Sequence, residues 1–266
     1  MGSIIDHVKK YRFLLNELVK KGIKLRYRRS YLGVLWTLLE PLLTMIVLTI
    51  IFGPLLGYSD DKLFPVYVLS GRLLYNFFSL ATKESTRSIR VNAAMIKKVY
   101  VPKYLYPLSY VLYNYVIFLI SLIVLAVVSL ILGLFPTVKL LLIFIPLINV
   151  FLLSLGVSLI LSTIGVFFRD MEYLWNVALT LIMYTCAIFY KTDRFSDTSW
   201  IIWIFKLNPL YGCIDNFRAA IGLADTFYTH CFNWNFALYC FVFGILTIVI
   251  GGLLFRKCQD RFILHI

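Results

Sequence analysis

The segment Lys20–Leu43 constrains this chain more than any other, because a dense run of cations meets a long apolar run there. The cations are Lys20, Lys21, Lys24, Arg26, Arg28 and Arg29. From Tyr31 to Gly57 the one Asp, Glu, Lys or Arg is Glu40, directly before Pro41. Lys and Arg beside a membrane span are retained on the cytoplasmic side. The junction therefore predicts a membrane protein whose N-terminal segment is cytoplasmic.

The composition of the chain supports a membrane location. Hydrophobic residues make up 61% of the sequence, charged residues 15%, and the mean hydropathy is +0.86. Soluble domains are typically about 45–50% apolar and about 25% charged. The net charge of +13 is also found in nucleic-acid-binding proteins. Here, however, the cations sit at the ends of apolar spans, which argues against nucleic acid. The five cysteines have no CxxC spacing, which argues against a thiol-rich metal site.

Six segments approach the length of about 20 apolar residues that a bilayer-crossing helix needs. They are Tyr31–Gly57, Phe64–Ala81, Tyr104–Leu134, Lys139–Phe168, Tyr173–Tyr190 and Trp234–Phe255. With the N-terminus inside, most Lys and Arg fall in the inner segments. The sequence therefore predicts an all-α, multi-pass protein with six transmembrane helices and both termini in the cytoplasm.

Three further stretches are expected to lie outside the spans. Residues 4–21 show apolar residues at steps of three and four, which predicts an amphipathic helix at the membrane interface. Residues 83–103 form a long inner loop, and residues 191–233 form an outer segment with two short helices that dip into the interface. We divide the chain into an interface helix (1–30) and a six-helix domain (31–266).

Sequence motifs for catalysis are absent. No GxxxxGK[ST] phosphate loop occurs, so nucleotide hydrolysis in the P-loop manner is excluded for this chain. Nor does the sequence contain a metal-ligand cluster, a GxSxG elbow or a pair of close carboxylates at membrane depth. The chain is therefore expected to be no enzyme by itself and to hold no cofactor or metal.

Two charged residues fall within the predicted spans, where charge is costly and usually functional. Glu40 lies about ten residues into the first span and Arg72 about nine into the second, so antiparallel neighbours bring them to similar depth. One interpretation is a Glu40–Arg72 ion pair. The alternative is a shifted second span, with Arg72 lining a water-filled vestibule without a partner.

Aromatic and basic residues supply the candidate contacts to a cargo. Tyr and Trp offer both stacking and hydrogen bonding to sugars, and the conduit candidates are Trp36, Tyr106, Tyr110 and Tyr113. For Tyr106 an ordinary interfacial belt is the favoured interpretation. The candidates for a pyrophosphate or lipid headgroup are Arg26, Arg28 and Arg29. Plain positive-inside topology with anionic-lipid binding explains that cluster equally well.

Four motifs in order make the chain resemble the ABC-2 type membrane subunits of bacterial exporters of lipid-linked polysaccharides. They are KLRYRRSYLGVLWTLLEPLL, AAMIKKVYVPKYLYPLSYVL, VFFRDMEYLW and LNPLYGCIDNFRAAI. The resemblance implies the type V exporter fold, with six transmembrane helices and two short re-entrant outer helices between the fifth and the sixth. It also implies a homodimer with a central pathway and two copies of a separate ATPase subunit, which binds ATP and magnesium.

The same resemblance assigns roles to two groups of residues. Those expected to contact the ATPase are Tyr11, Met95, Lys97, Lys98, Tyr100 and Lys103. Those expected in an outer gate are Trp200, Trp203, Pro209 and Arg218. Arg72 departs from the family pattern, since that position is usually apolar.

The predicted function is export of a lipid-linked polysaccharide, such as O-antigen, capsule or teichoic acid, across the bacterial inner membrane. One alternative keeps the family and changes the cargo to a small drug or lipid. A second is an ion-coupled secondary transporter, which usually shows internal repeats and midplane acidic residues. A third is a membrane glycosyl- or acyltransferase, which the missing catalytic motifs disfavour.

Overall fold

The computed structural model describes residues 4–27, 31–98, 101–191, 200–226 and 231–265, and all their regular secondary structure is helical. The long helices are α1 (Ile4–Tyr27), α2 (Trp36–Leu55), α3 (Phe64–Thr86), α6 (Leu105–Ile131), α7 (Phe144–Phe167), α8 (Met171–Thr185) and α12 (Trp234–Cys258). The short ones are α4 (Ser88–Val91), α5 (Ala93–Lys98), α9 (Trp200–Leu207), α10 (Pro209–Ala220), α11 (Leu223–Thr226) and α13 (Phe262–His265). Within the described residues, 3₁₀ turns cover Gly33–Leu35, Val138–Ile143 and Gln259–Arg261.

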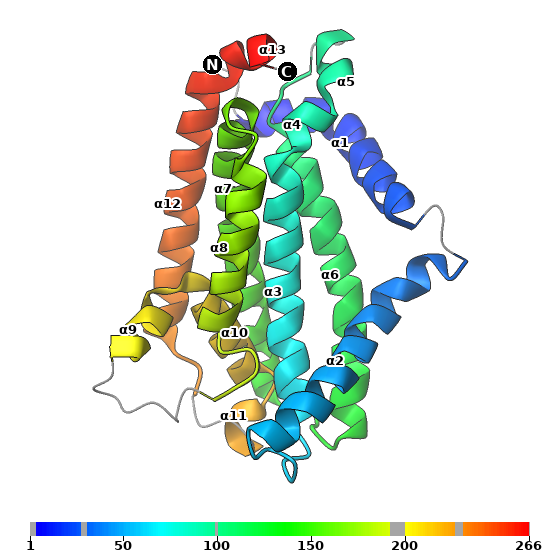
Figure 1. Ribbon diagram of the computed structural model, residues 1–266, viewed down its shortest axis with the longest axis vertical. Coiled ribbons are helices and arrows are strands. Elements are labelled where there is room, and N and C mark those ends of the chain that lie inside the picture. The colour runs from blue at the N-terminus through cyan, green and yellow to red at the C-terminus, as the bar shows by residue number, and fades with distance from the viewer. Residues whose placement is uncertain (1–3, 28–30, 99–100, 192–199, 227–230, 266) are drawn as a thin grey trace.

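The molecule has two distinct ends, joined by the long helices (Figure 1). One end carries α4, α5 and α13, with α1 beside them, and we name it the α5 end. The opposite end carries α11 and the neighbouring part of α10, and we name it the α11 end. The segments predicted to lie on the two sides of a membrane are therefore separated by the length of the bundle.

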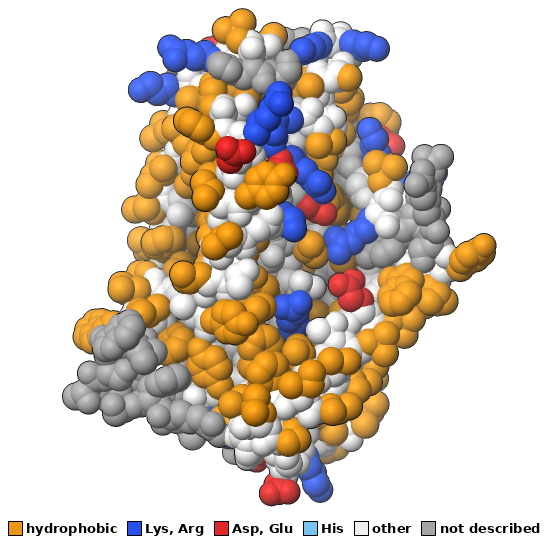
Figure 2. Space-filling model, in the orientation of Figure 1, with side chains coloured by type: hydrophobic (Ala, Val, Ile, Leu, Met, Phe, Trp, Pro, Cys, Tyr) orange, Lys and Arg blue, Asp and Glu red, His pale blue; other side chains and the backbone are white. Residues whose placement is uncertain are grey.

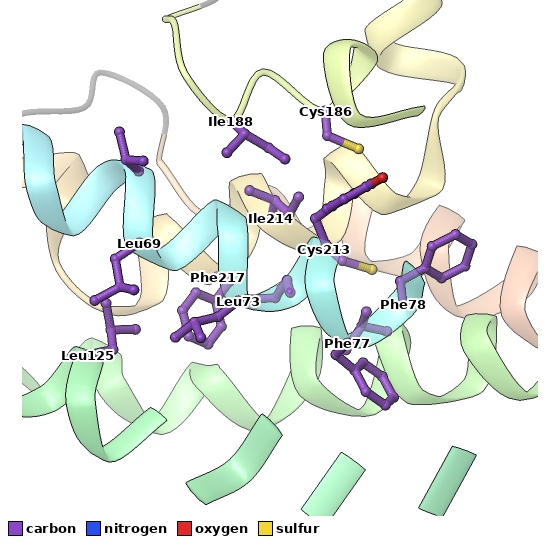
Figure 3. Packing of buried hydrophobic residues seen from close by; sticks show 14 of the residues in the cluster. Leu69, Leu73, Phe77, Phe78, Leu125, Cys186, Ile188, Cys213, Ile214 and Phe217 are labelled. Atoms are coloured by element: carbon purple, nitrogen blue, oxygen red, sulfur yellow. The ribbon is translucent and has the colours of Figure 1, made fainter. Parts of the chain in front are cut away.

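Helix α3 runs through the centre of the fold and packs against α2, α6, α7, α8 and α10. Its side chains from Val66 to Gly71 are all buried. Figure 3 shows Leu69, Leu73 and Phe77 of α3 facing α6, where Leu125 lies beside Leu69. Ile214 and Phe217 of α10 close the core from the other side. A helix covered on so many faces organises the whole subunit.

Helices α7 and α12 form the tightest pair in the bundle because glycines let their backbones approach. A Cβ atom on Gly156 would lie 2.3 Å from Thr247 Oγ1 and 2.7 Å from the Ile248 backbone nitrogen. A Cβ atom on Gly251 would lie 2.9 Å from the Gly156 carbonyl oxygen. Small residues at such crossings are typical of helices that pack in a membrane.

Four segments are long and apolar enough to cross a membrane, among the residues that the structure describes. They are Trp36–Leu55, Leu105–Ile131, Val138–Phe167 and Trp234–Leu264, which match four of the six predicted spans. The second predicted span forms α3, which is too polar for this criterion, and the fifth forms α8, which is too short. At 1.5 Å per residue the 15 residues of α8 cover about 22 Å.

The fifth span ends earlier than the sequence suggested. The prediction extended it to Tyr190, whereas α8 ends at Thr185. The chain turns there because Ala187 adopts φ +46°, a left-handed conformation that is unusual for a residue with a Cβ atom. Residues Cys186, Ala187 and Ile188 are fully buried, so the turn is anchored in the core.

Helix α1 confirms the predicted N-terminal helix and extends it to Tyr27, but its apolar side packs against protein. Leu15 is buried in a cluster with Ile89 of α4, Leu105 and Tyr106 of α6, and Phe262 of α13. The C-terminal half of α1 lies along α6, where Gly22 faces the ring of Tyr113 closely. Part of the apolar side of this amphipathic helix is therefore covered by the rest of the subunit.

The outer segment contains the two expected short helices, α9 and α10, together with α11. Asn208 caps α10 by accepting a hydrogen bond from the Leu210 backbone, and Pro209 occupies the first turn, where proline is favoured. Helix α10 is buried along nearly its whole length, against α3, α7 and α12. In contrast, Trp203 on α9 is exposed.

Candidate functional site

A polar stripe interrupts the buried surface of α3. Its side chains are only partly buried or exposed, and they recur at steps of three and four residues, which places them on one helix face. The stripe consists of Arg72, Asn76, Ser79, Lys83 and Arg87, and we call it the α3 stripe. Figure 2 shows charged side chains continuing from the α5 end down over α3 to the middle of this face. A polar line at this depth in an apolar bundle indicates function rather than packing.

Arg72 does not pair with Glu40, so that hypothesis is corrected. Its Nη1 atom donates to Met183 Sδ at 3.5 Å, and its guanidinium carbon lies 5.8 Å from the Tyr75 ring centre. The first contact is with α8 and the second lies within α3, whereas Glu40 lies on α2. The depth argument was insufficient because two helices at the same depth can still present their charges in different directions.

Polar side chains contribute to the attachment of α8, alongside the apolar contacts that Leu179 and Trp175 make with the core. Trp175 Nε1 donates to Thr82 Oγ1 at 2.9 Å, and the Tyr75 hydroxyl donates to the Leu179 carbonyl at 2.8 Å. Near the α5 end, Arg90 forms an ion pair with Glu172. Leu179 is the one fully buried residue of α8. The helix therefore borders the α3 stripe without being embedded in the core.

A second polar group joins α1, α3 and α6. The Glu84 carboxylate accepts hydrogen bonds from the Tyr113 hydroxyl and from Asn114 Nδ2, the latter at 2.7 Å. Asn114 Oδ1 in turn accepts from Arg26 Nη1 at 3.1 Å. Sequence reasoning missed Glu84, Asn114 and Asn76. The spacing of Asn76 and Lys83 from Arg72 was a signal for the stripe, but nothing local connects residues 26, 84 and 114.

An open cleft lies next to this group, between α2, α3 and α6. Its polar lining residues are Arg26, Thr37, Glu40, Asn76, Asn114 and Ser121. The rest of the wall is apolar and includes Leu73, Phe77 and Phe118. The cleft encloses about 410 Å³, counting the part open to solvent. Arg26, Glu40 and Asn76, which are far apart in sequence, therefore meet in one place.

The tyrosines expected to line a conduit have different environments. Tyr106 is fully buried in the cluster near the α5 end, so the conduit assignment is wrong for it in this conformation. Tyr113 is also buried, because its hydroxyl binds Glu84 and its ring packs on Gly22. Tyr110 is partly buried, with its ring centre 5.5 Å from that of Tyr113. Trp36 begins α2 and is exposed.

Of the residues expected to contact an ATPase, those that the structure describes lie around the α5 end, but they differ in exposure. Lys97 and Lys98 are exposed, whereas Tyr11 and Met95 pack against the local apolar cluster. Tyr100 lies outside the described residues. Lys103 is engaged internally, since its Nζ donates to the Gln259 carbonyl at 2.5 Å. Burial lowers the pKa of Lys103, and the nearby Asp260 opposes that effect.

Among the expected outer-gate residues, Arg218 is fully buried and acts as a clamp. Its Nη1 donates to the Ala187 carbonyl at 3.0 Å, and its Nη2 donates to the carbonyls of Tyr67 at 3.1 Å and Ile188 at 3.3 Å. Its guanidinium carbon lies 3.5 Å from the Tyr67 ring centre. Pro209 begins α10, Trp203 is exposed, and the side chain of Trp200 is outside the described set. Arg28 and Arg29 also lie outside the described residues.

Comparison with known proteins identifies the family. The sequence profile of the ABC-2 type transporter family matches residues 14–222, which include the α3 stripe, the cleft and the Arg218 clamp. The chain belongs to the ABC-2 type transporter family. Membership in this family indicates a transport subunit, and the apolar helices agree with a multi-pass membrane protein.

Several relatives of this ABC-2 chain have names that describe their activity. An O-antigen export system permease protein, RfbA, of Klebsiella pneumoniae is 30% identical over 251 residues, covering 94% of this chain and 93% of the relative. A permease of the same name from Myxococcus xanthus is 29% identical, covering 82% and 84%. The polysialic acid transport protein KpsM of Escherichia coli is 24% identical, covering 91% and 92%.

Proposed function

We propose that this chain is the membrane-spanning subunit of an ATP-driven exporter that moves a lipid-linked polysaccharide across the bacterial inner membrane. The observation that carries the proposal is similarity over nearly the full length to permeases named for O-antigen export and polysialic acid transport. The α3 stripe adds structural support, because a polymer rich in hydroxyl groups requires polar surface at membrane depth.

The proposed arrangement is a homodimer in which the two α3 stripes face a shared pathway. A single stripe covers one side of a path, and a second copy related by two-fold symmetry supplies the other. Helices α2 and α8 border the stripe and each exposes several large apolar side chains, which suits contact with lipid or with a partner subunit. Two copies of a separate ATPase subunit are expected at the α5 end, where Lys97 and Lys98 are exposed.

We further propose six membrane crossings with both termini in the cytoplasm. Helices α3 and α8 supply the two crossings beyond the four apolar segments, since both run alongside those segments in Figure 1. The polarity of α3 is tolerated because its charged residues face a water-filled path. Helices α9 and α10 form the re-entrant pair at the outer side, near the α11 end.

Reconstitution tests the function directly. The full chain and its partner ATPase are placed in proteoliposomes that contain a lipid-linked glycan, and accessibility of the glycan to an external lectin is followed after ATP is added. We expect ATP-dependent exposure that disappears when the ATPase carries an inactive nucleotide site. Transport that persists without the ATPase and follows an ion gradient would reject the proposal in favour of secondary transport.

Replacing Arg72 by methionine is expected to reduce export at least about tenfold while the subunit still assembles. The methionine keeps the length of the side chain and its contact with the Met183 thioether, but removes the charge from the α3 stripe. Lys62→Met serves as the control, because Lys62 is exposed and lies outside the stripe. Export by the Arg72→Met protein equal to that of the Lys62→Met protein would show that the charge at this depth is dispensable.

A further inference from the structure

The geometry of the cleft between α2, α3 and α6 points to a binding site for a phosphosugar headgroup. We propose that Arg26 and Asn76 bind the diphosphate of the cargo and that Glu40 binds hydroxyl groups of its first sugar. The inference rests on the proposed function, because it assigns the headgroup of the lipid-linked cargo to named residues. It goes beyond that function by specifying a site with two distinct chemical parts.

Arg26 supplies the cationic part of the site. A guanidinium carries five N–H donors in a planar fork that fits phosphate oxygens. In the structure Arg26 makes one hydrogen bond to a described residue, and its acceptor is the neutral amide oxygen of Asn114. None of the described carboxylates lies within ion-pair distance of it. The guanidinium therefore borders the cleft with its charge uncompensated by any of these groups.

The amide of Asn114 fixes the position of this guanidinium at the cleft wall. Asn114 is 2% exposed, and its Nδ2 donates to Glu84 and to the Tyr110 carbonyl at 2.9 Å. Since both amide hydrogens are used in this way, Oδ1 is left to face Arg26. The Glu84 carboxylate also accepts a hydrogen bond from the Tyr113 hydroxyl. The Glu84 carboxylate thus lies on the side of Asn114 that faces away from Arg26 and from a bound phosphate.

Glu40 and Asn76 complete the polar lining from the other two helices. Asn76 lies on the α3 stripe, and its amide makes no hydrogen bond to a described residue. Glu40 is exposed in the second turn of α2, and an ionised carboxylate is solely an acceptor. A simple phosphate would be repelled by such a group. A headgroup that joins a phosphate to hydroxyl donors matches a cleft that contains both a cation and a carboxylate.

The remaining wall of the cleft suits the apolar parts of the same ligand. Leu73, Phe77, Leu80 and Phe118 line it. Phe77 and Phe118 are buried and stack on each other, so they form an apolar floor beneath the polar groups. The cleft also lies where the exposed apolar surface of α2 begins, so a lipid tail bound outside the subunit is close to it. One ligand can therefore place its tail in lipid and its headgroup in the cleft.

Binding measurements on the full chain in complex with its ATPase, in nanodiscs, test the assignment. The probes are a polyprenyl diphosphate that carries one N-acetylglucosamine, the same polyprenyl diphosphate without sugar, and phosphatidylglycerol. For Arg26→Gln we expect affinity for both diphosphate probes to fall at least about tenfold. Lys24→Gln is the matched control, because Lys24 is exposed on the same helix and removal of its charge leaves the cleft unchanged. We expect less than about a twofold effect there.

Two further variants separate the parts of the site and guard against loss of folding. Asn76→Leu alters the opposite wall of the cleft without changing α1. It is expected to lower the affinity for both diphosphate probes. Glu40→Gln is expected to lower the affinity for the sugar-bearing probe about fivefold. Its affinity for the sugar-free diphosphate is expected to be unchanged or higher. Elution of each variant with the ATPase as a single complex verifies assembly.

Three results would overturn the assignment. The first is an equal effect of Arg26→Gln and Lys24→Gln, which would indicate bulk charge. The second is an equal loss of phosphatidylglycerol binding, which would indicate a general phospholipid site. The third is a Glu40→Gln protein that binds both diphosphate probes like the parent. The proposed function itself fails if the parent complex binds neither diphosphate probe and exports no glycan. In contrast, the three results above overturn only the site assignment, because they are obtained with a parent complex that binds the probes.

Discussion

Arg218→Leu is expected to abolish accumulation of a folded subunit. Arg218 is fully buried and donates to three backbone carbonyls, from α3 and from the turn that follows α8. Hydrogen bonds from charged groups contribute about 1.5–3 kcal/mol each, so losing two or more costs at least about 3 kcal/mol. The guanidinium also stacks on Tyr67. Leucine fills part of the volume but satisfies none of the carbonyls.

The measurement is thermal unfolding of the purified subunit in detergent, together with its yield from membranes. Arg169→Leu is the control, because Arg169 is an exposed cation outside the core. Arg218→Lys is expected to recover little, since one ammonium cannot reproduce a planar fork that serves several carbonyls. Gly71→Ala is an independent test of the same clamp and is also expected to lower the melting temperature, because its Cβ atom would lie 2.5 Å from Arg218 Nη2. A parental melting temperature for Arg218→Leu would contradict the clamp.

Gly156→Ala is expected to destabilise the pair of α7 and α12, although alanine is the better helix former by about 1 kcal/mol. The added methyl group would lie 2.7 Å from the backbone nitrogen of Ile248, so the helices must separate. Overpacking of this kind typically costs about 1–3 kcal/mol, and the loss of neighbouring contacts adds to it. We therefore expect a lower melting temperature and reduced yield.

A glycine on α12 that faces away from α7 provides the matched comparison. No atom outside the local helix lies within 4 Å of a Cβ atom placed on Gly252, whereas its neighbour Gly251 faces Gly156. Gly252→Ala is therefore expected to be neutral or slightly stabilising, and Gly251→Ala to be destabilising. If Gly156→Ala, Gly251→Ala and Gly252→Ala have the same melting temperature, the close approach of these helices does not govern stability.

The sequence predicted most of the helices because their signals are local. The apolar runs of α2, α6, α7 and α12 need no knowledge of neighbours, and the pattern Asn208-Pro209 marks the start of α10 through its capping chemistry. The end of α8 was missed because the residues around Ala187 contain no sequence signal that predicts a left-handed turn. That turn is held by Arg218, which is 31 residues away in sequence.

The contacts of the candidate site were less predictable, since they depend on how the helices are rotated against each other. One of the two interpretations of Glu40 and Arg72 paired them from their depth alone, whereas in the structure Arg72 contacts Met183 and Glu40 lines the cleft. Arg26 was recognised as a candidate because of its charge. Its place beside Asn114 follows from the packing of α1 on α6, which no periodicity in either helix reveals.

The way α8 is attached has a consequence for how the subunit can change shape. Displacing a helix from an apolar core exposes apolar surface and loses the free energy gained by burying it. Only another apolar surface can restore that free energy. The bonds made by Thr82, Tyr75 and Arg90 to α8 are different in kind, because water or the polar groups of a passing glycan can replace them one at a time. Movement of α8 away from α3 therefore exchanges hydrogen-bond partners at these three residues, whereas Leu179 and the ring of Trp175, which pack against the core, need a new apolar surface to cover them.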